Sequence, residues 1–104
     1  MWKPHYTIWK EFKIKILAEI FGTYIFLLVI ICTGNAWAIG LILALVILFL
    51  GKTSGGNFNP AVTVMMVLGK KQPASDLVPY ITAQLFAGFV ALQTCNLLKS
   101  QKLL

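Results

Sequence analysis

Hydrophobic residues fill most of the chain in three long runs, at residues 16–33, 36–50 and 77–98. About 20 apolar residues in a helix cross a hydrocarbon core of ~30 Å. We therefore expect three membrane spans, of which the second is short. Gly34-Asn35 separates the first two runs and predicts a tight turn, because both residue types tolerate positive φ.

A polar, glycine-containing segment at residues 53–59 breaks this pattern, and a short apolar run follows it to Gly69. Asn59 is a favourable helix N-cap and Pro60 suits the first helical position, so a helix is expected from about Pro60 to Gly69. Its length of about 15 Å is roughly half of the hydrocarbon core. This pattern predicts a re-entrant loop and half-helix over residues 52–69, whose non-helical backbone must be buried or line a watery cavity.

Both ends of the chain are polar. Residues 1–15 mix lysines with aromatic side chains, which predicts a cytoplasmic lead-in that anchors at the membrane interface, and residues 99–104 form a short polar tail. The lysine distribution predicts a multi-pass integral membrane protein with a cytoplasmic N-terminus. Seven lysines fall on that side (3, 10, 13, 15, 52, 70 and 71) and two on the other (99 and 102).

Composition supports a membrane protein, since 59% of the residues are hydrophobic and only 12% are charged. The net charge of +6 comes from lysines scattered at span ends, without a basic face, so we expect the lipid bilayer and no nucleic acid as partner. There is no nucleophile–base pair, metal-ligand cluster or phosphate-binding loop. We therefore expect no enzyme, no metal and no cofactor.

Glu19 lies near the start of the first span. A carboxylate inside a span costs about 2.5 kcal/mol or more near the membrane centre. Two interpretations follow. The side chain either snorkels to the cytoplasmic interface, or it is a buried acceptor that orders the loop around Gly55 and Asn57.

Small residues in the apolar runs suggest helix packing. Three alanines recur at every fourth position of the third run beside Gly88, which predicts a close-packing surface, with lipid-facing alanines as the alternative. Cys32 and Cys95 lack metal-ligand spacing and are expected to be small packing residues. The alanines are Ala83, Ala87 and Ala91.

Three strings resemble the major intrinsic protein family, the aquaporins and glycerol facilitators. Residues 54–63 (SGGNFNPAVT) resemble its first Asn-Pro-Ala signature, residues 18–23 (AEIFGT) a string of its first helix, and residues 79–85 (PYITAQL) the start of its third helix. They occur in the family's order and spacing and cover roughly residues 10–98. The resemblance implies an all-α membrane protein. Its fold would be an aquaporin-like half-repeat of three transmembrane helices and one re-entrant half-helix, over residues 16–98.

The same resemblance implies a passive channel for water or small neutral solutes such as glycerol, with the pore built around Asn59, Pro60 and Ala61. Capping fixes the Asn59 side chain, whose amide can then point N–H groups into the pore. The positive end of the half-helix disfavours cations and protons. The loop carbonyls would accept hydrogen bonds from the solute. The loop residues are Gly55, Gly56, Asn57 and Phe58.

Further residues take expected roles from the resemblance. Glu19 and Gln84 are expected to support the loop. Lys52 and Asn57 stand where the family commonly has His, and Lys52 would lie at the cytoplasmic mouth. Ile39 occupies the second-helix position of the family's selectivity filter and implies a wider or more apolar filter.

One half-helix cannot close a pore. The family's second Asn-Pro-Ala, its filter arginine and its last three helices have no match in these 104 residues. The channel hypothesis therefore requires a second half-repeat, from a homo-oligomer or a separate chain, and the lysine asymmetry disfavours an inverted homodimer. The alternative is a non-conducting, truncated aquaporin-like protein, or an assembly or regulatory partner of full-length channels.

Overall fold

The computed structural model describes residues 2–104, and all the regular secondary structure of these residues is helical, without strands. Three helices are long and apolar enough to cross a membrane, which confirms the predicted all-α class with three long apolar helices. The elements are α1 (His5–Thr33), α2 (Ala36–Ser54), α3 (Pro60–Leu68), the short 3₁₀ helix η1 (Ala74–Asp76) and α4 (Leu77–Ser100).

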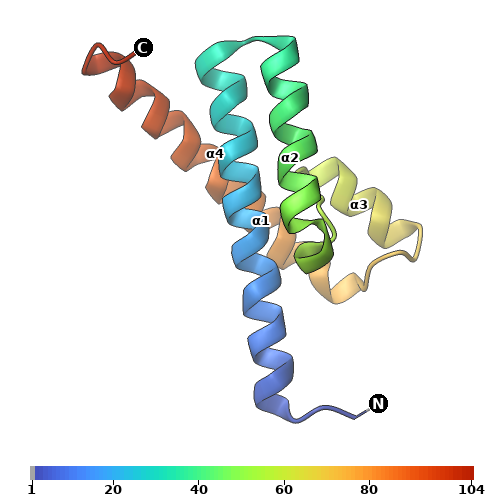
Figure 1. Cartoon of the computed structure of the whole chain (residues 1–104). Coiled ribbons are helices and arrows are strands. Elements are labelled where there is room, and N and C mark those ends of the chain that lie inside the picture. Colours follow the sequence, from blue (N-terminus) through green and yellow to red (C-terminus); the bar gives the residue numbers. More distant parts are fainter. Residues whose placement is uncertain (1) are drawn as a thin grey trace.

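Helix α1 is the centre of the arrangement (Figure 1). α2 returns antiparallel beside it, and α4 crosses it obliquely and packs against it. The short α3 begins near mid-height and descends toward the end at which α1 starts. It contacts α4. Because the longest extent is 52 Å, the chain exceeds a hydrocarbon core of ~30 Å.

Two helix ends differ from the expected spans. α1 begins at His5, eleven residues before the expected span, so most of the lead-in is helical. α2 continues through Lys52 to Ser54, although the loop was expected to start at residue 52. It ends where Gly55, with φ +93°, donates its N–H to the Gly51 carbonyl oxygen at 2.8 Å. Hydropathy reports where a helix leaves the membrane, whereas the helix itself continues to a residue that can adopt positive φ.

The α1–α2 turn has the expected chemistry. Gly34 takes positive φ (58°) and donates its N–H to the Ile30 carbonyl oxygen, which ends α1. Asn35 then caps α2, because its Oδ1 accepts from the Ala38 N–H at 2.9 Å. A two-residue connection therefore reverses the chain.

Small residues bring α4 close to its neighbours. The three alanines of the predicted packing face, Ala83, Ala87 and Ala91, are buried rather than lipid-facing. Gly88 lies so close to α1 that an added Cβ would sit 3.1 Å from Cδ1 of Leu27. Close approach of this kind is how helices associate in lipid.

The expectation for the cysteines was wrong. Cys95 is buried on the same face as the alanines, but a disulfide joins it to Cys32, with the two Cα atoms 5.7 Å apart. The crossing of α1 and α4 brings together two residues that are 63 positions apart in the sequence. The bond lies far from His5, at the end of α1 that meets α2.

Candidate functional site

Asn59 starts α3 and leaves its amide nitrogen free. The residue is extended (φ −162°), and its Oδ1 accepts from the Ala61 N–H at 2.8 Å. Pro60 follows at the first helical position, where the missing N–H leaves no helical bond unmade. Asn59 itself is exposed, so its Nδ2 can donate hydrogen bonds outward. The helix N-terminus and this amide together form an electropositive point.

The Glu19 carboxylate holds the loop that precedes Asn59. Glu19 is fully buried and does not snorkel. Its Oε2 accepts from the Ser54 hydroxyl at 2.6 Å and from the Asn57 N–H at 3.2 Å. Its Oε1 accepts from the Phe58 N–H at 2.9 Å and from Gln84 Nε2 at 2.9 Å. One carboxylate thus satisfies both backbone donors of the turn and ties them to α4.

Thr63 joins the same network from the first turns of α3. Its Oγ1 accepts from Asn57 Nδ2 at 2.9 Å and from Gln84 Nε2 at 2.8 Å. Thr63, Asn57 and Gln84 are all buried and cannot bind water, so their polar groups are satisfied by these bonds to one another. α1, the loop, α3 and α4 are therefore fixed relative to one another by polar contacts.

The network continues toward the end of the molecule at which α1 starts. Asn57 Nδ2 also donates to Gln72 Oε1 at 2.8 Å, and Gln72 Nε2 donates to Asp76 Oδ2 at 3.1 Å. Asp76 is buried and pairs with Lys15 at 2.8 Å. Nearby, the Tyr80 hydroxyl donates to the Ser54 carbonyl oxygen at 2.6 Å. The Lys15–Asp76 ion pair therefore anchors the α3–α4 connection to α1.

The loop backbone is strained. Gly55 and Gly56 have positive φ (93° and 68°), and so does Phe58 (56°), which is not a glycine. A non-glycine residue in this region costs about 1–3 kcal/mol, which must be compensated by its surroundings. Here the Phe58 N–H binds Glu19, and its ring is buried against Gly22. These contacts fix the backbone of Phe58 and therefore the direction in which the next residue, Asn59, points.

An open hollow of about 360 Å³ lies in front of Asn59 and Pro60. Its walls are mostly apolar and include Phe26, Leu27 and Phe89. Two buried polar atoms at this hollow, Thr23 Oγ1 and Gln84 Oε1, have no hydrogen-bond partner among the described residues. Both atoms are enclosed by the surrounding protein, so they add no exposed polar group to the hollow.

Comparison with known proteins identifies the family of the chain. The family model of the major intrinsic protein matches residues 7–103. The chain belongs to the major intrinsic protein family. Members of this family are membrane channels rather than enzymes, and the chain is an integral, multi-pass membrane protein.

Individual relatives have related names. The chain is 40% identical over 86 residues to Glycerol uptake facilitator protein-like 6 of Lactiplantibacillus plantarum, covering 74% of the chain and 40% of that protein. It is 33% identical over 92 residues to Aquaporin Z of Photorhabdus laumondii (74% and 40%). It is 33% identical over 99 residues to Nodulin-26 of Glycine max (81% and 36%). The chain therefore spans about two fifths of the length of these relatives. No solved structure matches it significantly.

The residues singled out from the major intrinsic protein signature lie in different places. Asn59 and Pro60 line the hollow with Gln84 and the buried Phe58, whereas Asn57 is buried and does not line it. Ile39 is half-buried in the first turns of α2, and Lys52 is exposed in its last turn. Neither Ile39 nor Lys52 lines this hollow.

Sequence reasoning missed several members of the network. Asp76 and Tyr80 were not singled out, although they precede Gln84, which was expected to support the loop, at four-residue steps. The three therefore share one face where η1 joins α4. That spacing was a usable signal for a polar face. No comparable signal identified Thr63 as an acceptor or paired Lys15 with Asp76, because both depend on how the helices cross.

Proposed function

We propose that this chain is one half of a passive channel for water or small neutral solutes such as glycerol, with the pore built around Asn59, Pro60 and Ala61. The observation that carries the proposal is the Asn59 amide nitrogen, held free at the start of α3 beside an open hollow. An N–H donor at the positive end of a helix hydrogen-bonds a neutral oxygen and repels a cation. The carboxylate that binds the loop backbone, Glu19, accepts four hydrogen bonds within the described chain.

We further propose that a second half-repeat, from another copy or a separate chain, supplies the opposite wall of the pore. Support comes from the exposure of Asn59 and Ala61 and from the open hollow beside Asn59. Irregular backbone at membrane depth is tolerated only against protein or water, so lipid cannot cover this loop. The re-entrant position of residues 52–69 belongs to the same proposal.

We also infer that the N-terminus faces the cytoplasm. The lysine bias supports this orientation, and so does the Cys32–Cys95 disulfide at the opposite end, because disulfides persist in oxidising compartments. In intact cells, a membrane-impermeant maleimide should label a Ser100→Cys chain. A Trp2→Cys chain should be labelled only after permeabilisation, and the reverse pattern would show the opposite orientation.

An osmotic swelling assay on vesicles that contain the purified chain tests conduction. The Asn59→Asp chain keeps an oxygen to cap α3 but loses the outward donor and places a carboxylate at the hollow. We expect its water or glycerol flux to fall up to about tenfold, because the hydrogen bond that the lost donor makes to a neutral oxygen contributes about 0.5–1.5 kcal/mol. Asn35→Asp is the matched control, since Asn35 caps α2 in the same way, far from the hollow. Wild-type flux equal to that of empty vesicles would leave the assembly-partner alternative.

A further inference from the structure

We propose that the first turns of α1 bind the headgroups of anionic phospholipids, through the unpaired lysines Lys10 and Lys13 beside Trp9. This interaction surface is independent of whether the chain conducts. It consists of residues 5–14, which we call the basic collar.

The length of α1 places the basic collar at headgroup depth. The helix has 29 residues and is therefore about 43 Å long, whereas the hydrocarbon core is ~30 Å thick. Figure 1 shows its first turns extending past the ends of α2 and α3. Since the hydrophobic run begins near residue 16, the excess length lies at the N-terminal end, where the chain crosses the headgroup layer.

Charge pairing leaves this end with free positive charge. Lys3 pairs with Glu11 at 2.8 Å, and Lys15 pairs with Asp76 at 2.8 Å. Within residues 2–104, no carboxylate pairs with Lys10 or Lys13. The carboxylates of Glu11 and Asp76 are thus already engaged, and the ammonium groups of Lys10 and Lys13 are left to attract an anion from outside.

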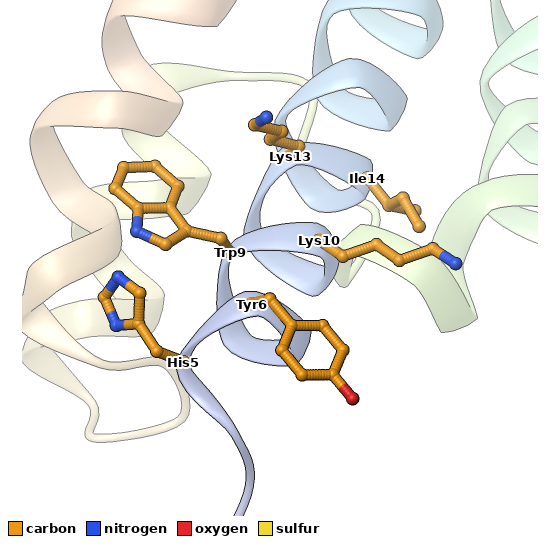
Figure 2. Close-up of a pocket in the computed structure, with 6 residues that line it drawn as sticks. All are labelled: His5, Tyr6, Trp9, Lys10, Lys13 and Ile14. Carbon is orange, nitrogen blue, oxygen red and sulfur yellow. The ribbon is translucent and has the colours of Figure 1, made fainter.

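The side chains of the basic collar match a lipid headgroup. Six of them line a shallow, open hollow of about 490 Å³ (Figure 2). His5 and Trp9 lie on one flank of the helix, with Tyr6 and Lys10 on the other, and Lys13 follows one turn above Trp9. Exposed aromatic rings such as that of Trp9 are enriched at the membrane–water interface, where lysine ammonium groups bind lipid phosphates. Lys70 and Lys71 line a second hollow at the same end of the molecule.

The position of the basic collar beside a membrane span favours a lipid headgroup over a soluble anion as its ligand. The basic collar continues directly from a membrane span, so a bilayer always presents headgroups to it. An acidic protein or nucleic acid would have to displace these lipids. Membrane lipids also offer the aromatic rings an apolar glycerol and acyl region that a free anion lacks.

Native mass spectrometry of the full chain in neutral detergent tests the proposal, with phosphatidylglycerol and phosphatidylcholine of equal chain length as probes. We expect the wild type to bind phosphatidylglycerol roughly thirtyfold more tightly, from about a fivefold contribution of each free lysine. The Lys10→Gln/Lys13→Gln chain should lose this preference, and Lys10→Arg/Lys13→Arg should retain it. Lys99→Gln/Lys102→Gln removes the same charge at the other end and should leave the preference unchanged.

Several outcomes would overturn the proposal. Equal binding of the two lipids by the wild type would do so, as would equal losses in the Lys10/Lys13 and Lys99/Lys102 glutamine variants. Inorganic phosphate at millimolar concentration should not displace phosphatidylglycerol, and displacement would identify a free-anion site instead. The substituted lysines are exposed, so these variants should unfold at wild-type temperatures.

Discussion

Replacing Glu19 with glutamine should destabilise the chain by roughly 3 kcal/mol. The buried carboxylate accepts hydrogen bonds with two oxygens, whereas the glutamine amide has only one acceptor oxygen. The carboxylate accepts from the Ser54 hydroxyl, from two backbone N–H groups of the loop and from Gln84. In glutamine, an NH₂ group would replace one of the two carboxylate oxygens and would face the donors that this oxygen accepts from. Thermal unfolding in detergent measures the loss.

The matched control is Glu11→Gln. Glu11 is exposed and pairs with Lys3 on the surface, where an ion pair contributes about 0–1 kcal/mol. In the Glu19→Gln chain, the amide hydrogens of Asn57 and Phe58 should also exchange with solvent faster than in the wild type, because their acceptor is weakened or lost. Equal unfolding temperatures for the two variants would mean that Glu19 does not hold the loop.

Replacing Gly22 with alanine should cost about 1–3 kcal/mol through overpacking. An added Cβ would lie 2.7 Å from Cδ1 and Cζ of Phe58, and closer still to Cε1. The Phe58 ring cannot yield easily, because its residue already has positive φ and its N–H is bound to Glu19. The displaced ring would move Asn59, the next residue, away from its place at the hollow.

Gly40→Ala provides the control for this substitution. Gly40 is also helical, but nothing lies within 4 Å of an added Cβ. Alanine should therefore be neutral or stabilise α2 by up to about 1 kcal/mol. The comparison uses thermal unfolding together with hydrogen exchange over residues 54–59. Similar behaviour of the two alanine variants would show that Phe58 does not need the space at Gly22.

The sequence predicted the elements of this site better than their connections. Asn59, Pro60 and Gly69 are local helix signals, so the expected short helix agrees with α3 to within one residue. Glu19 was noticed because a carboxylate is expensive inside an apolar run. Each of these signals is carried by the residue and its immediate neighbours.

Contacts between distant segments were not predictable in the same way. The Cys32–Cys95 disulfide and the Lys15–Asp76 pair join residues 63 and 61 positions apart. Both require the oblique crossing of α1 and α4, which small residues such as Ala87 permit but do not specify. The early start of α1 was missed for another reason, since hydropathy detects the membrane and not the helix.

We propose that the start of α3 lies near the middle of the membrane and faces water. α3 has nine residues, so Pro60 should lie about 14 Å from the lysines that follow Gly69, near the centre of a ~30 Å core. Spin labels on Ala61→Cys and on Leu45→Cys, in the middle of α2, test this by paramagnetic relaxation in reconstituted membranes. We expect the Ala61 label to meet a water-soluble nickel chelate more often than oxygen, and the Leu45 label to show the opposite. A lipid-like response at both positions would contradict the claim.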